Sequence, residues 1–113
     1  MEDASDQKYA VVMRVGSPDR PSFQLRKGEV GLSVFDPDGV HPPLSDEEIL
    51  EVFRPGSIVI YRTREQIERL GLLVCDAERA EFLPIRVRCC HREIRRPESM
   101  DRKQFKLCLH EVE

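Results

Sequence analysis

One stretch of the chain, FRPGSIVIYRTREQIERLGLLVC (residues 53–75), carries the signals for a turn, two strands and the short helix between them. The β-branched and aromatic run 58–61 predicts a strand with both faces covered. Thr63 and Gln66 form a capping-box pattern, in which the threonine hydroxyl accepts from a helical N–H and the glutamine reaches back to the cap. Gly71 stands where a helix C-terminal cap belongs, and the apolar run after it predicts the next strand. Because these local signals agree, we expect the rest of the chain to be arranged around this segment.

The other elements follow from apolar and polar alternation and from turn residues. A helix is predicted to begin at the Ser45 cap, with Glu48 completing a second capping box. Further strands are predicted at 9–15, 23–26, 31–35, 82–90 and 105–110. The sequence therefore predicts an α+β fold, with a mixed, mainly antiparallel sheet of about six strands and two short helices on one face. A small, partly open β-barrel with helical insertions is the alternative architecture.

Length and composition predict one domain. The 113 residues are close to the commonest domain length and bury enough surface for a core without disulfide or metal staples. Residues 1–7 are polar and acidic and are expected to be a disordered N-terminus, which leaves 8–113 as a single α+β domain. There is no secretory signal pattern and no apolar run near the ~20 residues that span a bilayer. We therefore expect a cytoplasmic protein with no membrane partner and with its four cysteines reduced.

Charge is segregated along the chain. Residues 36–51 contain six carboxylates and no lysine or arginine, whereas residues 86–106 contain eight basic residues against three acids. This pattern favours a small non-catalytic protein-interaction or accessory module that binds an acidic protein surface, or a second copy of itself, through an arginine-rich strand and loop. Nucleic acid is not favoured, because the net charge is −3 and no aromatic residues alternate with the arginines. The predicted partner-binding residues are Arg86, Arg88, Arg92, Arg95 and Arg96.

A nucleotide-binding domain is the first alternative function. Arg14 lies in the first predicted strand, Ser33 lies in a later apolar strand, and Glu111 lies near the C-terminus. The order of these three residues resembles that of the ADP-ribosyltransferase superfamily. The resemblance implies that Arg14 and Ser33 hold NAD or another nucleotide and that Glu111 orients the ribose for attack. These three residues are the catalytic candidates of this alternative, and the sequence otherwise leans away from an enzyme, with no cofactor predicted.

A metal-stabilised domain is the second alternative. Cys90, Cys108 and His110 would approach one another if the last two predicted strands paired, and zinc accepts thiolate and imidazole ligands. The chain has no Cys-x-x-Cys knuckle, and its arginines would oppose a cation. The primary prediction is therefore that no metal is bound.

Overall fold

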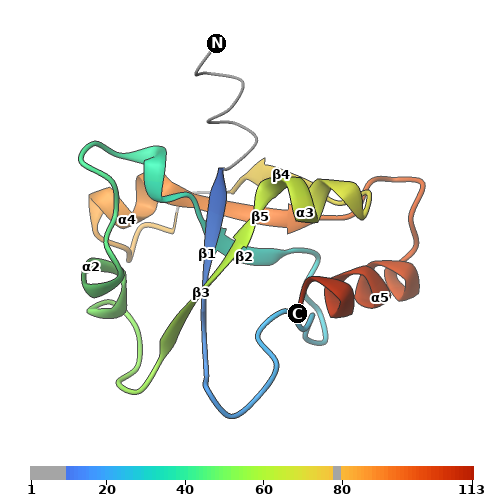
Figure 1. Ribbon diagram of the computed structural model, residues 1–113, viewed down its shortest axis with the longest axis horizontal. Helices are drawn as coiled ribbons and strands as arrows, with labels where there is room; N and C mark the ends of the chain where they lie inside the picture. The colour runs from blue at the N-terminus through green and yellow to red at the C-terminus, as the bar shows by residue number, and fades with distance from the viewer. Residues whose placement is uncertain (1–9, 78–79) are drawn as a thin grey trace.

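A computed structural model describes residues 10–77 and 80–113, in which five strands form one sheet (Figure 1). Every strand pairing in it is antiparallel, and the strands lie in the order β3-β1-β2-β5-β4. The α+β fold is confirmed, as an open antiparallel sheet of five strands with four short helices. The predicted disordered segment 1–7 lies outside the described residues. The strands are β1 (Val11–Gly16), β2 (Leu32–Phe35), β3 (Ile58–Thr63), β4 (Leu73–Asp76) and β5 (His91–Arg95).

The longest pairing joins β1 to the strand of the organising segment. Six residue pairs, from Val11 opposite Thr63 to Gly16 opposite Ile58, hold β1 against β3. On the other side of β1, β2 pairs only at Met13 opposite Phe35, so the two strands diverge beyond that point. The loop that connects β1 to β2 therefore has room to fold back beside the end of β1.

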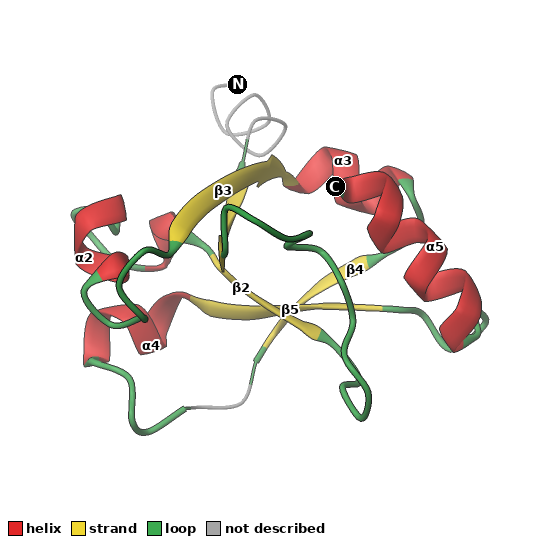
Figure 2. Ribbon diagram, turned by 90° about the horizontal axis from the view of Figure 1, so that it is seen from below, coloured by secondary structure: helices red, strands yellow, loops and turns green. Residues whose placement is uncertain are grey.

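Helices lie on both faces of the sheet, where two on one face were expected. Successive residues of β1 point to opposite faces, so Val12 enters one core cluster and Met13 enters the other. Helices α3 and α5 contribute to the cluster of Val12, and α2 and α4 to the cluster of Met13 (Figure 2). A short 3₁₀ helix, η1 (Pro37–Gly39), follows β2. The helices are α2 (Asp46–Leu50), α3 (Arg64–Arg69), α4 (Ile85–Cys90) and α5 (Arg102–Val112).

Both predicted N-terminal caps are confirmed. Ser45 Oγ accepts from the Glu48 N–H at 3.1 Å, and Thr63 Oγ1 accepts from the Gln66 N–H at 3.1 Å. Gly71 ends α3 with a φ of +83°, a conformation that residues with a side chain rarely adopt. Local capping signals thus located the starts of α2 and α3.

The last predicted strand is wrong, because residues 102–112 form helix α5. The alternation of Phe105, Leu107 and Leu109 suggested a strand, but only Phe105 and Leu109 are buried, and Leu107 is 55% exposed. The buried positions 105, 108, 109 and 112 follow the spacing of one helix face. The carboxylate of Asp101 caps this helix by accepting from the Gln104 N–H at 2.8 Å.

The predicted strand 82–90 is also wrong, because most of it forms α4. Leu83, Val87 and Cys90 are buried at helical spacing, whereas Ile85 is 64% exposed. The predicted strand at 23–26 has the expected alternation but pairs with no described strand, and its apolar residues pack as a loop against the α5 side of the core. None of the helices in the described part of the chain is long and apolar enough to cross a membrane.

Candidate anion-binding site

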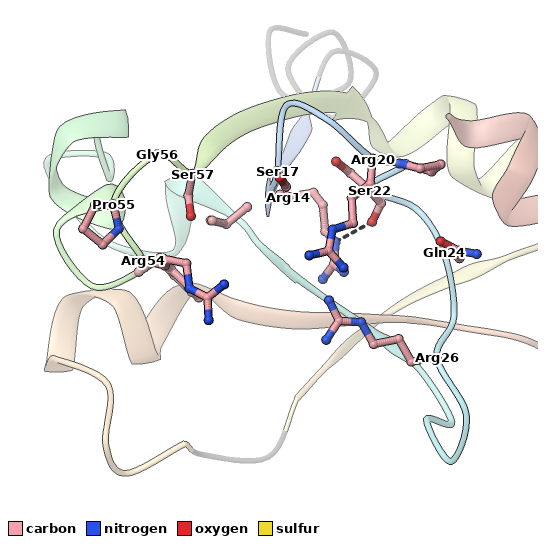
Figure 3. A pocket seen from close by; sticks show the side chains of 14 residues that line it. Arg14, Ser17, Arg20, Ser22, Gln24, Arg26, Arg54, Pro55, Gly56 and Ser57 are labelled. Atoms are coloured by element: carbon pink, nitrogen blue, oxygen red, sulfur yellow. Dashed lines mark hydrogen bonds between the residues drawn. The ribbon is translucent and has the colours of Figure 1, made fainter.

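A cavity of about 280 Å³ opens where three segments meet: the end of β1, the loop that follows it, and the turn before β3 (Figure 3). Four arginines line it, and none of the described lining residues is acidic. Three serines and Gln24 add further polar groups to the wall. We call this cavity the arginine pocket, and its basic residues are Arg14, Arg20, Arg26 and Arg54.

Two glycines let the backbone take the shape of the pocket. At the end of β1, a Cβ on Gly16 would lie 2.2 Å from Ser22 Oγ, so the returning loop can lie there only because Gly16 has no side chain. Before β3, the Ser57 N–H donates to the Arg54 carbonyl at 3.1 Å, and Gly56 has a φ of +89°. Proline at the second position and glycine at the third are typical of a type II turn, which confirms the turn predicted there.

Arg14 is held rigidly by backbone carbonyls. Its Nε donates to the Ser22 carbonyl at 2.8 Å, and its Nη1 donates to the Ser33 carbonyl at 2.7 Å. Burial lowers the pKa of Arg14, Arg26 lowers it further, and two nearby glutamates outside the pocket lining oppose the change. Arg14 therefore carries a half-buried positive charge that is hydrogen-bonded by neutral carbonyls and only partly offset by the two glutamates, and such a charge favours an incoming anion.

The other three arginines of the pocket lack such contacts with the described residues, although Arg20 acts electrostatically on the neighbouring Asp19. Within the described residues, the side chains of Arg20, Arg26 and Arg54 make no hydrogen bond and no ion pair. Each of the ten other described arginines makes at least one such contact. The unpartnered guanidinium groups are thus not scattered over the surface but line a single cavity. In Figure 3, Arg26 and Arg54 extend from different segments toward the space beside Arg14.

The structure brings together two of the three residues that resemble the ADP-ribosyltransferase order. Arg14 donates to the backbone carbonyl of Ser33, and the Ser33 hydroxyl lies 3.1 Å from His91 Nε2. Glu111, the third residue, is exposed on α5 and makes no hydrogen bond or ion pair with the described residues. A different carboxylate, that of Glu113, is close enough to Arg14 to raise its pKa.

The three candidate metal ligands are not brought together. Cys90 is buried in the core cluster on the α4 face of the sheet, and Cys108 is buried in the cluster on the α5 face. His110 is exposed on α5. Burial raises the pKa of the Cys90 thiol, which keeps it protonated. The sheet separates Cys90 from Cys108. Among the described residues, no three metal-binding side chains come together.

Two of the predicted partner-binding arginines lie on α4 and are used within the fold. Arg86 Nε donates to Glu48 Oε2 at 2.6 Å, and Arg86 Nη2 donates to Glu48 Oε1 at 3.2 Å, which ties α4 to α2. Arg88 donates to the Leu83 carbonyl at 2.9 Å, while its Nε is buried without a hydrogen-bond partner. The acidic helix and the basic segment therefore neutralise each other in part within the protein.

The other three lie on β5 and just beyond it. Arg92 Nε lies 3.4 Å from Asp76 Oδ1 on the neighbouring strand, and Arg95 Nε donates to Glu93 Oε1 at 2.5 Å. Arg96 donates to a backbone carbonyl in the following turn. The five arginines are thus spread over a helix, a strand and a loop, and each has an internal contact.

Sequence reasoning missed Arg20, Arg26 and Arg54, because the first two lie in the loop between β1 and β2 and Arg54 lies in a separate turn before β3. One signal was available: Arg20 and Arg54 are each followed by proline, with a serine one or two residues later, in the segments RPS and RPGS. No protein-family model, curated protein or solved structure matches this chain. The function proposed below is therefore inferred from the geometry of the pocket.

Proposed function

We propose that this protein binds a phosphate group in the arginine pocket, as a ligand-binding module and not as an enzyme. The observation that carries the proposal is that all three unpartnered arginines of the described chain line one cavity with the buried Arg14. Folding has placed like charges together in a cavity whose described lining contains no acidic residue, although the chain as a whole has a net charge of −3. An anionic ligand removes that mutual repulsion.

Phosphate suits this pocket better than a carboxylate does. A phosphate monoester carries about −1.5 to −2 charges at pH 7 and presents three acceptor oxygens. A guanidinium group presents its N–H donors as a planar fork that pairs with two of those oxygens. Four positive charges with no lining acid favour the more highly charged ligand, and Ser57 and Gln24 can donate to oxygens that the arginines leave.

The chemistry of the lining favours binding without turnover. General acid–base catalysis needs a titratable group within hydrogen-bond reach of the substrate. The described lining contains no aspartate, glutamate, histidine, cysteine or lysine. We also infer a cytoplasmic location, because all four cysteines are free thiols.

Calorimetric titration with inorganic phosphate tests the proposal. We compare the wild type with Arg54→Gln, which removes an exposed, unpartnered charge, and with Arg69→Gln as the matched control on α3. We expect saturable binding that weakens with added salt and weakens at least about tenfold in Arg54→Gln, because one charge-assisted hydrogen bond contributes about 1.5–3 kcal/mol. Arg69→Gln should bind as the wild type does. Equal loss in both variants, or no saturation at all, would reject the proposal.

We propose a protein partner as a second candidate function, located on part of the arginine-rich segment. Arg95 and Arg96 line a shallow hollow together with Val30, which is 71% exposed. An exposed apolar side chain beside arginines is a common composition for a protein contact. Affinity purification at low salt should recover a stoichiometric acidic partner with the wild type but not with Val30→Asp. Recovery of the same proteins by both would argue against a docking site here.

A further inference from the structure

A second, mostly apolar cavity of about 130 Å³ lies against the arginine pocket. The two cavities share Arg14, Val15 and Phe53 in their linings, so these residues form the boundary between them. A ligand that extends across this boundary from the arginine pocket would place its adjoining group on the other side of Arg14. The second cavity, which we call the aromatic cavity, is also lined by Ser33, Phe35, Ala80, Phe82, Leu83 and His91.

Flat rings dominate the walls of the aromatic cavity. Phe35 and His91 are stacked with their ring centroids 5.3 Å apart, at an interplanar angle of 28°. Phe53 meets Phe35 edge to face at 6.0 Å and 73°. Phe82 lies on the rim of this cavity and is 85% exposed. The walls thus offer ring faces and edges to an incoming planar group.

We propose that the physiological ligand is an aromatic phosphate, a phosphate monoester with a planar ring next to the phosphoryl group. The ring enters the aromatic cavity while the phosphate stays in the arginine pocket, so this inference rests on the proposed phosphate-binding function. The size of the cavity fits one ring, because an apolar cavity of roughly 150 Å³ is known to take up benzene. The paired Ser33 hydroxyl and His91 imidazole, 3.1 Å apart, are placed to meet a polar substituent on that ring.

Three phosphates separate the contribution of the ring from that of the charge. Methyl phosphate, cyclohexyl phosphate and phenyl phosphate present the same anionic group with a small, an apolar non-planar and an aromatic substituent. We expect phenyl phosphate to bind at least about tenfold more tightly than methyl phosphate, which corresponds to about 1.4 kcal/mol of added binding free energy. Cyclohexyl phosphate should bind more weakly than phenyl phosphate, because it cannot stack on flat rings.

Two variants test whether the aromatic cavity is the source of the preference for phenyl phosphate. Phe82→Ala removes the exposed rim ring and should reduce the preference for phenyl over methyl phosphate severalfold while leaving affinity for inorganic phosphate unchanged. Leu107→Ala, which removes another exposed apolar side chain on α5, is the matched control and should leave the preference intact. Both positions are exposed, so neither substitution should unfold the protein.

The outcomes of these titrations distinguish the aromatic-ligand inference from the proposed phosphate-binding function. If inorganic phosphate binds and Arg54→Gln weakens it, but phenyl and methyl phosphate bind equally, the aromatic ligand is refuted and phosphate binding stands. If cyclohexyl phosphate binds as tightly as phenyl phosphate, the requirement for a planar ring is refuted. If no phosphate binds, the proposed function and this inference both fail.

Discussion

Replacing Gly16 by alanine tests the packing that shapes the arginine pocket. The new Cβ would lie 2.2 Å from Ser22 Oγ and 2.9 Å from Ser22 Cβ, and both distances are far inside normal contact. Ser22 is only 5% exposed, so it has little free space to move into. Its carbonyl also accepts the Nε hydrogen bond of Arg14, so a shift of Ser22 also displaces the buried charge of the pocket.

The expected cost is that of overpacking a filled site, about 1–3 kcal/mol. Rotation of the Ser22 hydroxyl relieves the shorter contact, but the contact between the two Cβ atoms remains and requires the backbone to move. We therefore expect Gly16→Ala to lower the free energy of unfolding by about 2 kcal/mol. For a domain of this length, that corresponds to a fall in Tm of about 8 °C. The affinity for phosphate should fall as well.

Urea denaturation of a double-mutant cycle measures this contact directly. Ser22→Gly removes both clashing atoms, so the variant Gly16→Ala/Ser22→Gly should be more stable than the sum of the two single effects predicts. A coupling free energy of about 1 kcal/mol or more is expected for residues in such close contact. If the two substitutions are additive, or if Gly16→Ala changes stability by less than about 0.5 kcal/mol, the close approach of this loop to β1 is refuted.

Three further predictions follow from burial and pKa. Phe105 is fully buried, so Phe105→Ala should lower the free energy of unfolding in urea by about 3–5 kcal/mol, and a loss below about 1 kcal/mol would contradict the packing of α5. Burial and a hydrogen bond to Asp46 raise the pKa of Tyr61 to about 12, so this phenol should stabilise the fold below about pH 10 and lose that effect as pH rises through 12. NMR titration should show the Tyr61 pKa returning toward 10 in Asp46→Asn, and an unchanged value would refute the interaction. Iodoacetamide should alkylate the exposed Cys89 well before the buried Cys90, and equal rates would contradict the buried placement of Cys90.

Local signals in the sequence predicted some elements correctly and misled on others. The starts of α2 and α3 were predictable, because a capping box uses only residues within one turn of each other. Helix α5 was missed although Asp101 and Gln104 carry a similar local cap signal, because the alternation of Phe105, Leu107 and Leu109 also fits a strand. Strand β5 was not predicted, because Ile94 is its only aliphatic residue and the sequence shows no apolar alternation there. The strand depends on its pairing with β2 and β4.

The arginine pocket could not be predicted because it is made by tertiary structure. Arg14 was recognised as a candidate from its place in the first strand, and the structure places it in the pocket. Arg20, Arg26 and Arg54 were passed over in favour of the denser basic segment after residue 85. In the fold, the arginines of that segment have carboxylates and carbonyls as neighbours. Which arginines make hydrogen bonds and ion pairs is decided by the fold, and the sequence does not show it.

The most direct measurement is an NMR titration of the arginine side-chain Nε–H signals with inorganic phosphate. We expect saturable shifts at Arg20, Arg26 and Arg54, with a single dissociation constant, and no comparable shift at Arg69 or Arg86. Shifts of similar size at all the arginines, or none that saturate, would show that phosphate meets the protein only as a diffuse counterion. That result would contradict the claim that the pocket is a binding site.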